Sequence, residues 1–128
     1  KGFDKLKNLD FSEYIYDMPE KIACADVVIC RAGAMSISEM AFSGKCTILI
    51  PSPNVVDNHQ YKNAKVFSDA GAAILIEEKD FTGERLISEI DALLSDRARL
   101  SAIGENAKKM AIYDATERIV NCICEIVN

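Results

Sequence analysis

The chain has 128 residues, of which 49% are hydrophobic, and its formal net charge is −5. This length suits one domain around one core, and the hydrophobic content argues against a disordered chain. The net negative charge argues against a general nucleic-acid binder, whose footprint would be basic.

The cysteines give little support to a metal site. There are five of them, an odd number, and no Cys-x-x-Cys pair occurs, so a zinc centre is poorly supported. Four lie in apolar stretches, which predicts reduced, mostly buried thiols in a cytosolic protein: Cys24, Cys30, Cys46 and Cys122. No apolar run approaches the roughly 20 residues that a membrane helix needs.

The first part of the chain predicts a strand, a helix and a second strand. Residues 9–15 (LDFSEYI) are expected to form a short strand that runs into a loop. Pro19 suits the first turn of a helix over about 19–25. The continuous apolar run 27–30 is typical of a strand that is covered on both faces.

A helix and a buried strand are expected next. The helix over 35–43 should end at Gly44, because glycine favours the left-handed conformation that often closes a helix. The strand 47–50 should end at the prolines that follow it.

The second half predicts four helices and one further strand. The helices are expected from Asp57 or Asn58 to Ala70, from Thr82 to Leu94, from Asp96 through Met110, and from Asp114 to Val127. The strand is expected over 73–76, directly after Gly71. One apolar face of the second of these helices should be buried, made of Leu86, Ile87, Ile90, Leu93 and Leu94.

Strands that alternate with helices predict an α/β domain, a Rossmann-like parallel sheet with helices on both faces. In such sheets, ligands bind beyond the carboxyl ends of the strands. The loops that matter are then 14–18, 31–36, 51–59 and 77–81.

The stretch ADVVICRAGAMSISEMAFSGK contains a strand, a turn and a helix. Gly33 permits a backbone conformation or a close approach that a side chain would block. The first amides of the following helix have no internal acceptor and, with the helix dipole, form an anion site that suits a diphosphate. A plain tight turn that packs the helix on the sheet explains the same residues. Arg31 is either a phosphate partner or a solvated loop charge.

Two interpretations of Glu39 stay open. Ser36-x-x-Glu39 matches a capping box, in which Ser36 caps the helix and Glu39 reaches back to it. The alternative is a carboxylate that accepts two hydrogen bonds from a ribose diol.

The stretch DNHQYKNA places His59, the one histidine, before Gln60 at a helix start. These two polar side chains could hydrogen-bond sugar hydroxyls, although His59 could equally be a surface residue. No nucleophile with a base and no set of carboxylates at metal spacing identifies a catalytic centre.

The stretch EYIYDMP places Tyr14 and Tyr16 on the same side of an extended chain. One ring could stack on a planar base while the backbone at Ile15 reads the edge of that base. Such a stripe is more often core packing. From the residues alone, the prediction ends at an α/β domain with a nucleotide cleft.

Three stretches together, ADVVICRAGAMSISEMAFSGK, DNHQYKNA and the terminal DATERI, resemble the MurG family in its order and spacing. These are bacterial inverting glycosyltransferases of the GT-B fold. They transfer N-acetylglucosamine from UDP-N-acetylglucosamine to undecaprenyl-pyrophosphoryl-N-acetylmuramoyl-pentapeptide, which forms lipid II for peptidoglycan, cell wall biogenesis, cell shape and cell division. The resemblance covers essentially the whole chain and implies the C-terminal, donor-binding domain.

The resemblance implies roles for named residues. Tyr14 would border the uracil, the Ile15 backbone would pair with its edge, and Met18 would help close the pocket. The turn from Gly33 to Ser36 would hold the diphosphate and part of the sugar, and Glu39 would take the ribose hydroxyls. His59 and Gln60 would contact the N-acetylglucosamine hydroxyls, with Asn63 nearby. The full expected set is Tyr14, Ile15, Met18, Arg31, Gly33, Ala34, Met35, Ser36, Ile37, Ser38, Glu39, His59, Gln60 and Asn63.

The resemblance also implies what lies elsewhere. Residues 1–128 would be a partial UDP-sugar-binding domain, and the family's N-terminal domain, with the acceptor site, the general base and the membrane-facing surface, is absent. We therefore expect no catalytic residue in this chain, no transfer by it alone, and a soluble piece of an enzyme that works peripherally at the cytoplasmic face of the bacterial membrane. No metal or cofactor is expected, and the sequence has no Asp-x-Asp motif.

Two alternatives stay open at this point. One is the donor half of another GT-B UDP-sugar transferase, such as a diacylglycerol galactosyltransferase or a two-subunit eukaryotic N-acetylglucosaminyltransferase. The other is a non-catalytic nucleotide-binding α/β module.

Overall fold

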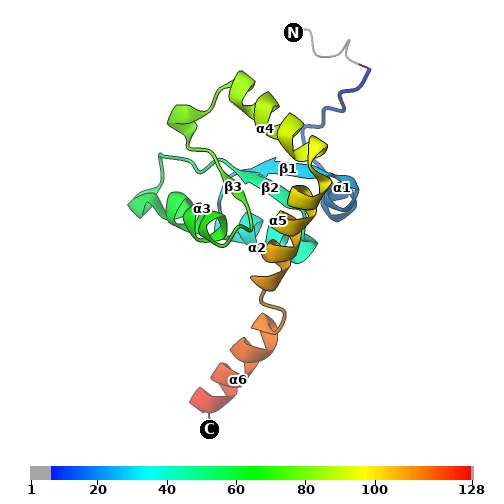
Figure 1. The fold of residues 1–128 in the computed structure, drawn as a ribbon. Helices are drawn as coiled ribbons and strands as arrows, with labels where there is room; N and C mark the ends of the chain where they lie inside the picture. Colours follow the sequence, from blue (N-terminus) through cyan, green and yellow to red (C-terminus); the bar gives the residue numbers. More distant parts are fainter. Residues whose placement is uncertain (1–6, 128) are drawn as a thin grey trace.

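The computed structural model describes residues 7–127 (Figure 1). Three parallel strands form one sheet in the order β1-β2-β3: β1 is Val27–Cys30, β2 is Cys46–Leu49 and β3 is Ile74–Leu75. The register sets Val27 opposite Cys46 and Ile48 opposite Ile74. The predicted α/β class is therefore confirmed, and the strands at 27–30, 47–50 and 73–76 are found within a residue or two of their expected bounds.

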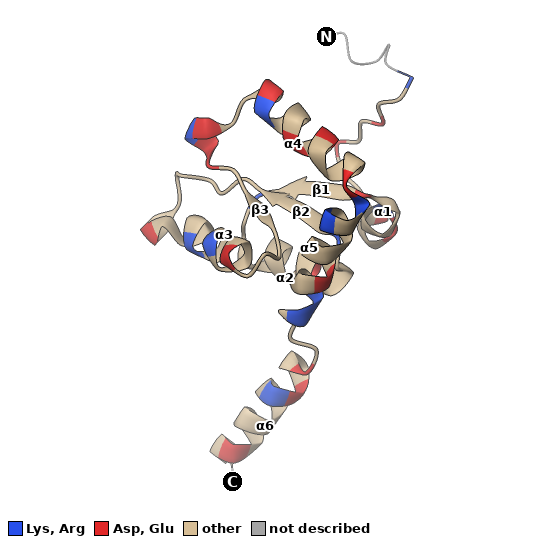
Figure 2. Cartoon of the chain, in the orientation of Figure 1, with Lys and Arg blue, Asp and Glu red and all other residues tan. Residues whose placement is uncertain are grey.

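Helices connect and cover these strands. They are α1 (Met18–Cys24), α2 (Ala34–Ser43), α3 (His59–Asp69), α4 (Gly83–Ser95), α5 (Arg97–Lys109) and α6 (Ala115–Val127), with short 3-10 turns η2 (Val56–Asn58) and η3 (Glu78–Asp80). In Figure 2 the charged residues lie on the helices and loops, and the strands carry none.

The sheet is covered on both faces. On one face, Ile48 and Ile76 pack with Leu93 of α4 and Ile103 of α5. On the other face, Leu49 packs with Ile37 of α2 and with Ala64 and Phe67 of α3. Because alternate residues of a strand point to opposite faces, the continuous apolar sequence of β2 serves both layers.

The helix-boundary signals act as expected. Gly44 ends α2 in the left-handed region, at φ 63°, and Gly71 follows α3 at φ 64°. The Thr82 hydroxyl accepts a hydrogen bond from the Arg85 amide at 3.1 Å, and the Asp96 carboxylate accepts one from the Arg99 amide at 3.0 Å. These contacts begin α4 and α5 at the predicted residues.

The start of α3 differs from this pattern. Asn58 occupies the N-cap position, but its side chain caps no amide. Asp57 and Asn58 instead have positive φ, 53° and 50°, which Asp and Asn adopt more readily than most residues.

The prediction of a strand over residues 9–15 is wrong. These residues have no strand conformation and lie exposed, with Phe11 at 84%. Their alternating pattern has no neighbouring strand to pair with among residues 7–127, and an unpaired strand is not stable by itself.

The expected burial of the thiols and of one helix face is wrong in part. Of the five cysteines, only Cys46 is buried, and Cys30 is half-buried. Cys24, Cys122 and Cys124 are exposed because α1 and α6 bury no residue. On α4, Leu93 is buried and Leu86 and Ile90 are half-buried, whereas Ile87 and Leu94 stay exposed because α4 meets the core along a narrower stripe than predicted.

Helix α6 forms where it is predicted and extends away from the rest of the molecule (Figure 1). No helix within residues 7–127 has both the length and the apolar character that crossing a bilayer requires.

Candidate functional site

The carboxyl ends of the three strands meet at one edge of the sheet. The Ile50 amide donates to the Cys30 carbonyl at 2.9 Å, and the Ile76 amide donates to the Leu49 carbonyl at 3.0 Å. These bonds continue the pairing one residue past the strands. The predicted loops after β1, β2 and β3 therefore leave the sheet together, at the edge where ligands of parallel sheets bind.

The turn from β1 into α2 presents free backbone amides. Gly33 is the N-cap of α2, no side chain in the described structure caps this helix, and the first helical bond runs from the Ile37 amide to the Gly33 carbonyl at 3.0 Å. The amides of residues 34–36 precede that bond and have no acceptor within the helix. They can bind an anionic group with the help of the helix dipole.

The expected conformational reason for Gly33 is wrong. Its φ is −66°, which any residue adopts, and a Cβ there would meet only the Ser36 hydroxyl oxygen, at 4.0 Å. The fold itself therefore has room for a side chain at this position. The absence of one leaves the approach to the helix amides open.

The capping-box interpretation of Glu39 is also wrong. Because Gly33 is the N-cap, Ser36 is the third residue of α2 and Glu39 the sixth, which is too far along the helix to reach back to its start. The neighbouring Ser38 hydroxyl donates to the Ala34 carbonyl at 3.0 Å. Glu39 itself is exposed and makes no hydrogen bond or ion pair with residues 7–127.

The Glu39 carboxylate acts on its surroundings through its charge. The pKa of the Cys30 thiol is raised above its usual value, first by burial and then by the negative charge of Glu39. Glu39 also lines a largely apolar cavity of about 520 Å³ between α1 and α2, together with Met18, Ile22, Phe42 and Lys45. Two of the predicted ligand residues, Met18 and Glu39, thus share one cavity.

A second hollow of about 250 Å³ lies on the other side of α2, toward α3. It brings together Ala34, Ile37, Ser38 and Asn63 from the predicted set. The two hollows flank the helix whose free amides start at residue 34. Neither is lined by Tyr14, Ile15, Arg31 or His59.

The polar residues of α3 hold neighbouring loops. The Gln60 carbonyl oxygen accepts from the Ser52 amide at 2.9 Å, and the Asn63 amide group donates to the Ala32 carbonyl at 3.3 Å. His59 is exposed, and its Nδ1 lies 2.8 Å from the Val56 carbonyl oxygen. In a neutral ring this contact places the proton on Nδ1 and leaves Nε2 as an acceptor.

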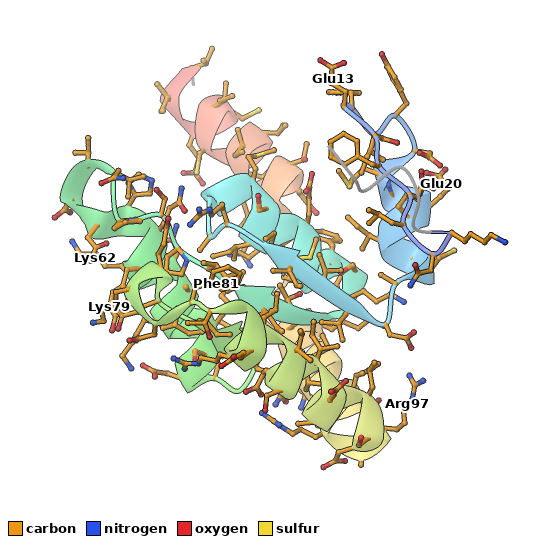
Figure 3. The ribbon with its side chains drawn as sticks, turned by 90° about the horizontal axis from the view of Figure 1, so that it is seen from above. Glu13, Glu20, Lys62, Lys79, Phe81 and Arg97 are labelled. Carbon is orange, nitrogen blue, oxygen red and sulfur yellow. The ribbon has the colours of Figure 1, made fainter. Side chains whose placement is uncertain are left out.

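The aromatic pair near the start of the described chain does not pack in the core. The Tyr14 and Tyr16 ring centroids lie 4.7 Å apart, yet the two residues are 69% and 90% exposed. Ile15 and Met18 are also exposed. Figure 3 shows this segment, marked by Glu13, on the opposite side of the view from Lys62 of α3. A ligand that touched both would have to extend across the start of α2.

Arg31 has partners that the sequence did not reveal. Its guanidinium donates to the Ile50 carbonyl at 3.2 Å and to the Glu78 carboxylate at 2.5 Å. The interpretation as a solvated loop charge is therefore incomplete. No local signal pairs residues 31 and 78, because they are 47 positions apart.

A family model described as the glycosyltransferase family 28 C-terminal domain matches residues 1–119. The chain belongs to this family. The expected α/β fold of a GT-B donor domain is thereby confirmed at the level of the family 28 domain. Within residues 7–127, no group of three or more His, Cys, Asp or Glu could hold a metal ion.

Relatives and a solved structure agree with this family 28 assignment. A transferase of Shewanella violacea is 46% identical over 115 residues, which are 90% of this chain and 32% of the relative. One of Acetivibrio thermocellus is 45% identical over 126 residues, 98% of this chain and 34% of the relative. Both carry the name UDP-N-acetylglucosamine–N-acetylmuramyl-(pentapeptide) pyrophosphoryl-undecaprenol N-acetylglucosamine transferase.

A crystal structure of Acinetobacter baumannii MurG matches with a TM-score of 0.78 at 34% identity, over 88% of this chain and 32% of that one. The likeness to the MurG family predicted from three motifs is thus confirmed. The family 28 chain spans about a third of the length of the curated relatives it matches.

Proposed function

We propose that this chain is the donor-binding part of an inverting N-acetylglucosaminyltransferase that uses UDP-N-acetylglucosamine. The observation that carries the proposal is the Glu39 carboxylate, which has no protein partner in the described structure, lines the cavity between α1 and α2, and belongs to the helix whose first amides are free. A capping contact or an ion pair would indicate a structural role, but Glu39 has neither among the described residues. A ribose diol offers two donors to such an acceptor, and a diphosphate satisfies the amides.

The two hollows beside α2 suggest where the parts of the donor would bind. Met18 and Glu39 would hold the nucleoside on the α1 side, with Tyr14 and the Ile15 backbone on the uracil. The turn from Gly33 through Ser36 would bind the diphosphate. Ile37, Ser38 and Asn63 line the hollow toward α3, and Gln60 and His59 at the start of α3, which line neither hollow, would contact the sugar hydroxyls.

The donor–acceptor pattern of α3 suits sugar hydroxyls. The Gln60 carbonyl oxygen is occupied by Ser52, so its amide group is left to donate. The Asn63 amide donates to Ala32, so its carbonyl oxygen is left to accept, and His59 Nε2 accepts as well. A hydroxyl both donates and accepts, so it can satisfy either kind of group.

The reaction would be a direct displacement. The 4-hydroxyl of the muramoyl unit attacks the anomeric carbon of N-acetylglucosamine, a new carbon–oxygen bond forms with inversion, and the bond to the diphosphate breaks. UDP leaves with the electron pair, and the hydroxyl proton goes to a base outside this chain. The contribution of this chain is to orient the donor and to stabilise the charge that develops on the leaving diphosphate through preorganised amides.

The relatives' names support the whole assignment. They describe transfer to N-acetylmuramyl-(pentapeptide) pyrophosphoryl-undecaprenol. We propose that the acceptor site, the general base and the peripheral membrane contact belong to the part of the relatives that this chain does not match, and that the enzyme works at the cytoplasmic face of the bacterial membrane in peptidoglycan synthesis.

Calorimetric titration of UDP-N-acetylglucosamine, UDP and GDP into the folded protein tests the donor assignment. We expect binding of both uridine nucleotides and much weaker binding of GDP. A folded sample that binds neither uridine nucleotide would contradict the proposal, and equal binding of GDP would reduce it to a general nucleotide module.

A further inference from the structure

Arg31 stands where the three strands end and contacts the chain after each of them. It follows β1 directly in the sequence. Its Nη1 donates to the carbonyl of Ile50, directly after β2, and pairs with the carboxylate of Glu78, three positions after β3. One guanidinium therefore links the three loops that emerge at the ligand edge of the sheet.

The same turn is also held from the other side. The Asn63 side chain of α3 donates to the carbonyl of Ala32, a fully buried residue. The turn of residues 31–33 leads into the free amides of α2, so its position sets where those amides point. Arg31 and Asn63 thus fix the turn from two directions.

The Arg31–Glu78 pair adds little to stability, because both side chains are about half exposed. The effect of the pair is to fix the position of the turn of residues 31–33. A displacement of about 1 Å in groups that position a substrate can cost on the order of 100-fold in rate. Both contacts use Nη1, whose two N–H groups are fixed in the guanidinium plane, so the donor directions are preorganised, whereas the N–H groups of a lysine ammonium rotate freely.

We infer that Arg31 is a positioning residue of the donor site: with Glu78 it holds the turn that aims the α2 amides, and it does not itself bind the diphosphate. This inference rests on the proposed function for its kinetic test. It replaces the expectation that Arg31 is a phosphate partner, because its charge is already committed to Glu78.

The two roles predict opposite signs for Glu78→Gln. If Arg31 positions the turn, loss of the Glu78 charge loosens it, and the KM for UDP-N-acetylglucosamine rises about tenfold, a part of what a 1 Å displacement can cost. If Arg31 binds the diphosphate, the same change frees the cation and leaves donor binding unchanged or tighter.

Three further variants complete the measurement in the full-length transferase. Arg31→Lys keeps the cation but loses the fixed planar donor geometry, so it should raise KM as Glu78→Gln does. The double variant Arg31→Lys/Glu78→Gln should be no worse than either single one. The matched control is Glu77→Gln. This neighbouring carboxylate pairs with Lys79 at 3.1 Å within its own segment and ties no strands together, so KM should stay at the wild-type value.

A second readout does not depend on the donor. The NMR amide signals of Gly33 and Ala34 should shift in Arg31→Lys and in Glu78→Gln but not in Glu77→Gln, with the melting temperatures of all variants close to wild type. Unmoved amides would overturn the inference whether or not UDP-N-acetylglucosamine binds. Moved amides in a protein that binds no uridine nucleotide would support the inference and contradict the proposed function instead.

Discussion

Glu39 is the residue on which the proposed site depends most. Sequence spacing left it between a capping box and a ligand contact, and the structure excludes the first because α2 begins at Ala34 rather than after Ser36. An exposed carboxylate in the middle of a helix contributes little to folding. Its role can therefore be separated from stability by experiment.

Glu39→Ala is expected to weaken donor binding by about 1–3 kcal/mol through loss of a charged acceptor, while unfolding stays near wild type. Titration of UDP-N-acetylglucosamine with parallel thermal melts measures both. Glu105→Ala is the matched control, since Glu105 is also an exposed glutamate inside a helix but lies on α5. A variant that melts earlier and still binds UDP normally would show Glu39 to be structural.

The thiols give a second test at the residue scale. Burial raises the pKa of Cys46 to about 11, so little reactive thiolate is present at pH 8, and the side chain is also inaccessible. Iodoacetamide at pH 8 should therefore modify the exposed Cys24 and leave Cys46 unmodified in the native protein, as read by peptide mass spectrometry. Equal rates at the two positions would contradict the packing of β2.

At the scale of elements, the helices were predictable because their signals are local. Thr82, Asp96 and Gly44 act within a turn of their own positions, and the structure has each where it was expected. The strand expected over 9–15 was wrong because a strand depends on a neighbour that local sequence does not specify.

Part of the proposed site can likewise be predicted from local sequence, and part cannot. Motif order predicts the turn at Gly33 and the start of α3 as parts of the donor site. The contacts of Arg31 with Glu78 and of Asn63 with Ala32 join residues 47 and 31 positions apart. The packing of the sheet creates these contacts, and no periodicity in the chain encodes them.

One packing contact between elements is sharp enough to test. Helix α5 crosses the turn after α2 so closely that a Cβ on Gly104 would lie 2.1 Å from the Gly44 carbonyl oxygen. Gly104→Ala should lower the free energy of unfolding by about 1–2 kcal/mol, because overpacking costs about 1–3 kcal/mol and alanine returns about 0.5–1 kcal/mol of helix propensity. Denaturant unfolding measures the difference.

Gly83→Ala is the control for that substitution. A Cβ at Gly83, the first residue of α4, meets nothing within 4 Å, so the free energy of unfolding should be unchanged or slightly higher. If both alanine variants behave alike, the close approach of α5 to the α2–β2 turn is not present in solution.

At the scale of the whole molecule, most features of the proposed site gather at one end. The strand ends, the free amides of α2, the hollow toward α3 and the polar side chains of α3 belong to the carboxyl edge of the sheet, whereas the cavity beside Glu39 runs along α2 toward its end at Ser43. In the described structure, this edge offers acceptors, donors and a cavity, but no nucleophile paired with a base. Such an arrangement can hold a nucleotide sugar without activating an acceptor hydroxyl.

If this chain binds the donor and the rest of the enzyme binds the acceptor, binding and transfer should have different outcomes in the two proteins. The 128-residue chain should not transfer N-acetylglucosamine to a lipid-linked muramoyl-pentapeptide acceptor, because the general base is proposed to lie outside this sequence. A polypeptide of the relatives' full length that carries the same segment should do so, and Glu39→Ala in it should raise the KM for the donor while the KM for the acceptor stays the same. Radiolabelled transfer from UDP-N-acetylglucosamine measures each case. Transfer by the 128-residue chain itself would mean that the base lies within this sequence and that the proposed division between donor and acceptor parts is wrong.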